Sequence, residues 1–187
     1  MNIKTIVAIV VLAAILAGGG FLMWQNSKAA VKDLNATLPE GVHVVKSLFG
    51  NEYKVVNKID GYEFKVPREW KGLENVEYFP ETTEGKYKVV SLNITGLEGL
   101  GKFIAVDKFL SEDEVNLTKA VDEILQDNGL ASELLKGKIG NFETIKTQGI
   151  QGLGGLNITF FKANDSIYAV TWGSEEFSEK VILTGRW

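Results

Sequence analysis

The feature that most constrains this chain is an apolar segment close to its N-terminus. The sequence IVAIVVLAAILAGGGFLMW runs from Ile6 to Trp24, and no charged residue lies between Lys4 and Lys28. As a helix, this interval of 23 residues spans roughly 35 Å, whereas the hydrocarbon core of a bilayer is about 30 Å thick. We therefore expect one transmembrane helix over residues 5–26, with the rest of the chain folded outside the bilayer.

The residues at the two ends of this segment predict its orientation. Residues 1–4 carry the amino terminus and Lys4, and positive charge keeps the end that bears it in the cytoplasm. Trp24 lies at the opposite end, where an indole prefers the headgroup layer, and Lys28 follows it. We expect Lys4, Trp24 and Lys28 to mark the membrane interfaces, and we expect the C-terminal domain to be extracytoplasmic.

A cleavable signal peptide is the alternative for this segment. The triplet SKA, Ser27–Ala29, places small residues at the two positions that a signal peptidase reads. The apolar run is long for a signal peptide, whose apolar region usually has about 7–15 residues. The sequence therefore favours a retained anchor, and it leaves open a secreted binding protein released by cleavage near Ala29.

Composition excludes several classes of site. The chain has no cysteine, which removes disulfides, thiolate metal centres and a catalytic thiol from consideration. Its formal net charge is −4, and we find no cluster of lysine and arginine. Because phosphate backbones require a basic surface, the sequence argues against nucleic acid as a partner.

The remaining residues predict a short stalk and then a domain rich in strands. Residues 27–40 are polar and contain Pro39, which indicates a juxtamembrane stalk, in part helical. The domain is expected over residues 41–187. The pair Asp60–Gly61 separates two β-rich runs and predicts a hairpin, in which Tyr62, Phe64 and Val66 alternate onto one face. Further strands are predicted over 86–95, 142–150, 155–163 and 166–174.

One long helix is predicted between these strands. Ser111 and Glu114 form a capping box, Asn116 is an alternative N-cap, and Gly129 ends the helix in a left-handed conformation. Its apolar stripe consists of Leu117, Val121, Ile124 and Leu125. A short second helix is expected over residues 131–135, and a helical turn with a last short strand at the C-terminus. This order predicts an α+β domain with a mostly antiparallel sheet.

A glycine-rich segment resembles a phosphate-binding loop. From Gly96 to Lys102 the chain reads G-x-x-x-x-G-K, but Phe103 replaces the hydroxyl residue that would bind magnesium. The following residues favour a strand, whereas phosphate binding requires a helix N-terminus. A similar segment, Gly149–Gly155, has no lysine. We interpret both as places where the backbone bends or passes close to a neighbour, and we expect no nucleotide.

The other candidate residues give little indication of catalysis or metal binding. His43 is the only histidine and lies in a run of valines, which is typical of a structural residue. The acidic run Ser111–Glu114 is better explained by the positive end of a helix than by calcium. Nothing selects a catalytic pair among the 24 acidic residues. We therefore predict no catalytic residue, no cofactor and no metal site.

Two sets of residues are candidates for contacts at the surface. Trp70, Tyr78 and Trp172 either pack in the core or form a surface that contacts a carbohydrate, peptide or protein. Five N-x-S/T triplets occur, and Asn35, in the predicted stalk, is the best candidate for glycosylation.

The order of these signals resembles the PsbP-like family. The likeness rests on GYEFKVPREW, residues 61–70, and on the C-terminal run from Thr147 to Trp187, which ends in TGRW where the family often has serine and phenylalanine. It implies an antiparallel sheet with helices packed on its faces, an α/β/α sandwich. Members of the family are mostly extracytoplasmic or lumenal accessory proteins. Some bind manganese or calcium weakly, but no residues here match such a site.

These observations predict a membrane-anchored, extracytoplasmic accessory or binding module that contacts another envelope component and is not an enzyme. A carboxylate-dependent hydrolase of the envelope remains an alternative, as does the secreted binding protein.

Overall fold

The computed structural model describes residues 25–48, 52–97, 102–111, 116–130, 133–148, 157–172 and 175–187. Within these ranges no helix combines the length and the apolar character that crossing a bilayer requires. The predicted anchor lies outside them except for its last two residues, and so does the glycine-rich segment 149–155.

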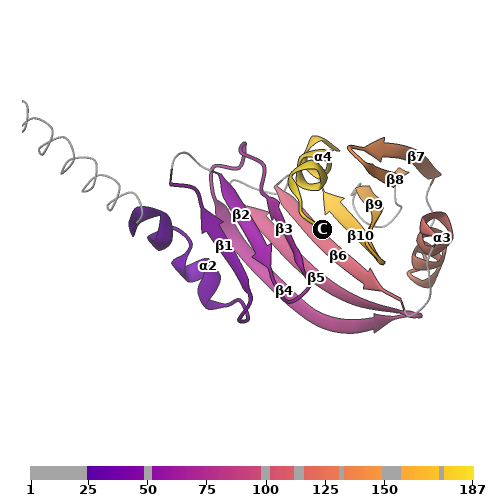
Figure 1. Ribbon diagram of the computed structural model, residues 1–187, viewed down its shortest axis with the longest axis horizontal. Coiled ribbons are helices and arrows are strands. Elements are labelled where there is room, and N and C mark those ends of the chain that lie inside the picture. Colours follow the sequence, from indigo (N-terminus) through magenta and orange to yellow (C-terminus); the bar gives the residue numbers. More distant parts are fainter. Residues whose placement is uncertain are drawn as a thin grey trace, which may run out of the picture.

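Two antiparallel sheets form the body of the domain (Figure 1). The small sheet has the order β1-β2-β3, with strands Val42–Lys46, Tyr53–Asn57 and Tyr62–Lys65. The large sheet has the order β4-β5-β6-β10-β9-β8-β7. Along the chain its strands are β4 (Leu73–Glu84), β5 (Tyr87–Gly96), β6 (Phe103–Leu110), β7 (Glu133–Ile139), β8 (Phe142–Gln148), β9 (Asn157–Ala163) and β10 (Ser166–Trp172).

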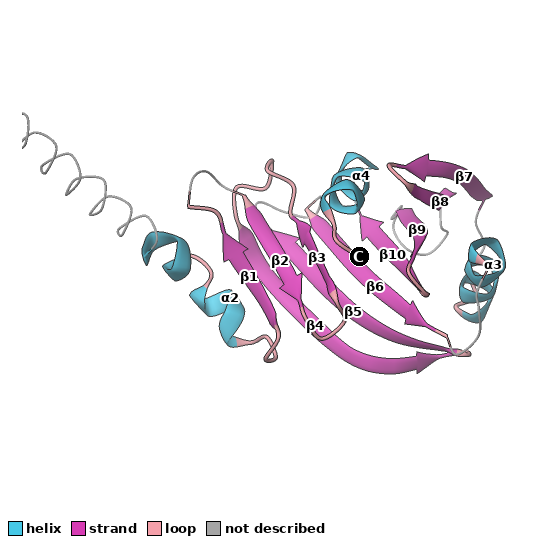
Figure 2. Cartoon of the chain, viewed as in Figure 1, coloured by secondary structure: helices cyan, strands magenta, loops and turns pink. Residues whose placement is uncertain are grey.

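Helices α2, α3 and α4 lie around these sheets (Figure 2). Helix α2 (Lys32–Ala36) lies beside β1, α3 (Leu117–Asp127) packs on β8 and β9, and α4 (Glu175–Thr184) contacts β3, β7 and β10. Residues 25–29 are also helical. The structure thus confirms an α+β fold built on antiparallel strands. It corrects the expectation of a single sheet, because none of β1–β3 pairs with a described strand of the large sheet.

Alternation along the strands of the large sheet creates two cores. One face carries Leu92, Val106 and Val170, which pack against the small sheet and α4. The opposite face carries Val89, Phe160 and Ala169, which pack with the buried residues of α3. Successive strand residues point to opposite faces, so one strand such as β5 supplies both cores. The large sheet is therefore the central layer of the domain.

Aromatic rings join the small sheet to the large one. Trp187 lies against Tyr62 and Phe64 of the small sheet at centroid distances of 5.7 and 6.0 Å. It also lies against Phe161 and Tyr168 of the large sheet at 4.9 and 5.1 Å. Arg186 pairs with Glu63 through two backbone hydrogen bonds of 2.7 and 2.9 Å, which hold the C-terminal residues beside β3.

The predicted hairpin at Asp60–Gly61 is confirmed. Asn57 pairs with Tyr62, and Gly61 has a φ of +78°, a conformation that glycine adopts without strain. The Asn57 side chain accepts from the Asp60 N–H at 3.0 Å and donates to the Asp60 carboxylate at 2.6 Å. Tyr62, Phe64 and Val66 are all buried, as their alternation predicted.

The long helix is confirmed with the later of its two predicted starts. α3 begins at Leu117, and the Asn116 side chain accepts from the Lys119 N–H at 3.2 Å, so Asn116 is the N-cap. Glu114 lies outside the described residues. Gly129 has the expected left-handed φ, +65°. From the predicted stripe Val121, Ile124 and Leu125 are buried, and Leu117 packs against them in part.

Three predictions about other segments were wrong. The expected helix over 131–135 is replaced by β7, which begins at Glu133 and pairs with β8 along its whole length. The expected last strand is only the isolated bridge at Arg186, because α4 extends to Thr184. The expected stalk packs on the domain: Val31 is only 6% exposed and belongs to the core. Residues 25–40 are therefore part of the folded unit.

We predict that the free energy of unfolding falls at alkaline pH, because three tyrosines of the domain are buried or half-buried. Burial raises the pKa of Tyr62 above its usual range and the pKa of Tyr78 and of Tyr168 to about 12, with a further contribution from the Asp60 carboxylate. In the unfolded chain the same phenols ionise near their ordinary pKa of about 10. The folded state then binds more protons than the unfolded state, so the free energy of unfolding is constant below about pH 10 and falls toward pH 12.

Urea unfolding at a series of pH values measures this effect, and Tyr168→Phe is expected to make the alkaline decline shallower. The same decline in Tyr168→Phe as in the parent chain would show that this phenol does not contribute.

Candidate functional site

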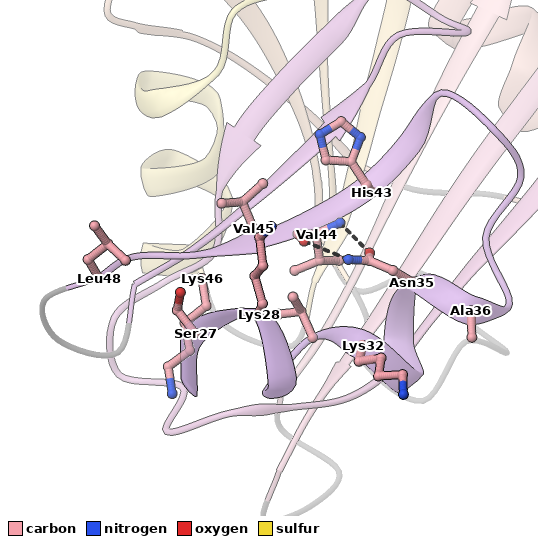
Figure 3. Close-up of a pocket in the computed structure, with 11 residues that line it drawn as sticks. Ser27, Lys28, Lys32, Asn35, Ala36, His43, Val44, Val45, Lys46 and Leu48 are labelled. Carbon is pink, nitrogen blue, oxygen red and sulfur yellow. Dashed lines mark hydrogen bonds between the residues drawn. The ribbon is translucent and has the colours of Figure 1, made fainter. Parts of the chain in front are cut away.

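A groove of about 620 Å³ lies between residues 25–36, which form two short helical pieces joined by a turn, and the edge strand β1 (Figure 3). Its walls come from two short stretches of chain, one on each side. They are Ser27, Lys28, Val31, Lys32, Asn35 and Ala36 from the helical side, and His43, Val44, Val45, Lys46 and Leu48 from the strand side.

The alternation of β1 explains why these residues line a groove. Val42 and Val44 point into the core and are 3% and 1% exposed, whereas His43 and Val45 lie on the other face. Val31 fixes the helical side by burying its side chain in the same core. The histidine is therefore a half-buried residue of the groove wall, and Val45 is an exposed apolar residue beside it.

Asn35 joins the two walls. Its amide nitrogen donates to the Val44 carbonyl at 2.9 Å, and its amide oxygen accepts from the Val44 N–H at 2.7 Å (dashed in Figure 3). The side chain thus occupies both backbone groups that Val44 presents at the free edge of the small sheet, in the way a neighbouring strand would. This arrangement argues against glycosylation of Asn35, because the amide nitrogen that a glycan would modify donates a half-buried hydrogen bond.

Replacing Asn35 with alanine is expected to lower the free energy of unfolding by about 1–2 kcal/mol, because two half-buried backbone groups lose their partner. Urea unfolding measures the change. Thr37→Ala is the matched control, since the Thr37 hydroxyl donates only to Leu34 within the same exposed turn, and its expected effect is below about 0.5 kcal/mol. Equal effects of the two substitutions would contradict the role given to Asn35.

The charges that line the groove are basic. Lys28, Lys32 and Lys46 line it together with His43, whereas Asp33 and Glu40 of the same segment do not. The Lys46 ammonium also lies 5.6 Å from the centre of the Tyr53 ring. Basic side chains next to exposed Val45 and Leu48, each 45% exposed, suit a ligand that carries both an anionic and an apolar part.

Elsewhere the described carboxylates with displaced pKa values are held by cations. Hydrogen bonds from Lys65 and Arg68 lower the pKa of Glu52, and a hydrogen bond from Lys180 lowers that of Glu69. A hydrogen bond from Lys86 likewise lowers the pKa of Glu123. Within the described ranges no group of three or more histidine, aspartate or glutamate side chains could hold a metal ion.

The structure places the predicted site residues in different environments. Lys4 and Trp24 lie outside the described ranges, whereas Lys28 is exposed and lines the groove. Trp70 and Trp172 are 0% and 4% exposed, so these two belong to the core and not to the proposed contact surface. Tyr78 is half-buried and packs against the same core. Burial of the two tryptophans corrects that hypothesis.

The segment that resembles a phosphate-binding loop leads into a strand. β6 begins at Phe103, at the place where phosphate binding would need a helix N-terminus. Gly96 passes close to Trp70: a Cβ atom at this position would lie 2.7 Å from Cε3 of the indole. The expected close approach is therefore present at Gly96, and the rest of the loop, residues 98–101, lies outside the described ranges.

No family model, no curated protein and no solved structure matches this chain. The sequence did not predict the groove. The one sequence signal that could have indicated its basic wall is the occurrence of Lys28 and Lys32 four residues apart, just after the apolar segment.

Proposed function

We propose that this chain is a membrane-anchored, extracytoplasmic binding module that contacts another component of the cell envelope and performs no catalysis. The observation that carries the proposal is the continuity of two features. The uncharged residues 5–26 lead without a linker into helical residues 25–29, and Val31, in the turn that follows them, packs in the core of the domain. Such a connection would hold the domain close to the surface of the bilayer.

Two further observations support this function. The PsbP-like pattern of residues 61–70 and 147–187 implies an extracytoplasmic accessory domain, and antiparallel strands with helices on both faces of the large sheet are compatible with it. The ion pairs of Glu52, Glu69 and Glu123 favour a binding role over a carboxylate hydrolase, because a general acid needs a raised pKa and these are lowered.

Membrane fractionation of the full-length chain tests the anchor. The native chain is expected to stay in the membrane pellet after alkaline carbonate extraction. The double substitution Leu12→Lys with Ile15→Lys is expected to release it, since each lysine at the centre of a span costs about 2.5–3.5 kcal/mol. Leu12→Ala with Ile15→Ala is the matched control and is expected to stay in the pellet. A native chain found in the soluble fraction would contradict the proposal.

Mass determination of the mature protein separates a retained anchor from a cleaved signal peptide. The proposal expects the N-terminal segment to be present, whereas a chain that begins at Ala30 would establish the secreted alternative.

A further inference from the structure

We propose that the groove between residues 25–36 and β1 binds the headgroup of an anionic phospholipid in the leaflet where the anchor leaves the membrane. This inference rests on the proposed function, because it requires residues 5–26 to span the bilayer. It goes further by assigning a ligand class to a specific set of residues. Lys28, Lys32 and Lys46 would pair with the phosphate, and Val45 and Leu48 would contact apolar parts of the lipid.

The position of the groove along the chain is the first argument. Lys28 and Lys32 follow Asn26, the last residue of the proposed span, by two and six residues. At about 1.5 Å per residue in a helix, both lysines would lie within about 10 Å of the membrane surface. A site in this position meets lipid headgroups at high local concentration, so even weak affinity gives high occupancy.

Charge is the second argument. Residues 28–48 contain three lysines against Asp33 and Glu40, whereas the whole chain has a net charge of −4. The two acidic side chains lie outside the groove wall, so the formally charged side chains that line it are all lysines. A basic groove beside the bilayer suits a leaflet that contains anionic lipids, because negative headgroups attract lysines that lie within a Debye length of them.

Two features favour a phospholipid over other anionic ligands. They are the exposed apolar residues of the groove and the hydrogen bonds from Asn35 to the edge of β1. A free phosphate ion would gain nothing from Val45 and Leu48, each 45% exposed beside the lysines. A peptide that added a strand to β1 would need the backbone groups of Val44, and Asn35 occupies both of them. A phospholipid uses the cationic and the apolar parts of the groove together.

The single histidine provides a direct probe. His43 lines the groove and is the only histidine in the chain, so one imidazole NMR signal reports on this site. The full-length chain is placed in nanodiscs of phosphatidylcholine that contain increasing fractions of phosphatidylglycerol. We expect the His43 signal to shift in a saturable way as the anionic fraction rises, and we expect added salt to weaken the response.

Two variants with the same change in net charge test whether the groove itself is responsible. In the triple substitution Lys28→Gln, Lys32→Gln, Lys46→Gln, apparent affinity for phosphatidylglycerol is expected to fall about 100-fold, since each lysine near the surface contributes about fivefold. The matched control replaces three exposed lysines away from the groove, Lys58→Gln, Lys136→Gln and Lys138→Gln, and is expected to respond like the native chain. Coincident urea transitions of the two variants establish that both are folded.

Three results would overturn the proposal. The His43 signal of the native chain does not move with phosphatidylglycerol, or it moves equally in both triple variants, or inorganic phosphate produces the same saturable shift. Each of these NMR results is measured only on protein that co-elutes with the nanodisc. A chain that fails to co-elute instead contradicts the anchor, so the two proposals fail in distinguishable ways.

Discussion

Replacing Phe161 with alanine is expected to lower the free energy of unfolding by about 3–5 kcal/mol. Phe161 lies on β9 and is 0% exposed. Its ring contacts Phe142, Tyr168 and Trp187 at centroid distances of 5.3, 5.4 and 4.9 Å. Truncation removes the side chain at the centre of the cluster that joins the two sheets, and the rigid rings around it leave a cavity. Most domains have only about 5–15 kcal/mol of stability, so this loss is a large fraction.

Urea unfolding of the full-length chain in detergent micelles, followed by tryptophan fluorescence, measures the effect. Phe79→Ala is the matched control, because Phe79 is 43% exposed on β4 and its removal leaves no enclosed cavity. We expect the control to change the free energy of unfolding by less than about 1 kcal/mol. Similar losses in the two variants would contradict the placement of the core between the sheets.

Replacing Gly96 with alanine is expected to cost about 2–3 kcal/mol, although a methyl group is the smallest addition possible. A Cβ atom at Gly96 would lie 2.7 Å from Cε3 of Trp70 and 3.0 Å from Cβ of Lys102. Trp70 is fully buried and its ring packs against Phe177 at a centroid distance of 5.8 Å. The indole therefore has no free space to move into, and β5 must shift instead.

The control for this substitution is a glycine in a strand with room for a side chain. At Gly137 on β7 the nearest atom to an added Cβ is the Thr144 hydroxyl, at an ordinary contact distance of 3.4 Å. Gly137→Ala is expected to be neutral or to stabilise by about 0.5–1 kcal/mol, because glycine loses more conformational freedom on folding. If Gly96→Ala is as stable as the parent chain, the close approach to Trp70 is wrong.

The sequence predicted correctly those elements whose structure is set by neighbouring residues along the chain. The hairpin at Asp60–Gly61 and the cap at Asn116 are examples, since turn and capping chemistry is set by a few neighbouring residues. β4 was missed because its sequence contains Pro80, which normally interrupts a strand. As the edge strand of the large sheet, with a register shift between Phe79 and Thr82, β4 tolerates a residue without an N–H.

Segments whose structure depends on contacts with residues far away in the sequence were predicted less well. Leu134 and Leu135 suit a helix locally, but pairing with β8 draws them into β7. The groove depends on where residues 25–36 pack, and nothing local indicates that the sequon at Asn35 would bind the edge of β1. Trp70 and Trp172 show the same limitation, because an aromatic residue in a strand or turn reveals its burial only when the facing elements are known.

The proposed function requires the domain to lie on the extracytoplasmic side of the membrane, and labelling of a single cysteine tests this most directly. The chain has no cysteine, so one introduced cysteine gives a single reporter. Asp165→Cys lies in the exposed turn between β9 and β10, and Asn2→Cys precedes the proposed span. With a membrane-impermeant maleimide on intact cells, we predict labelling of the cysteine at position 165, and of that at position 2 only after permeabilisation. Labelling in the opposite order would contradict the extracytoplasmic placement of the domain.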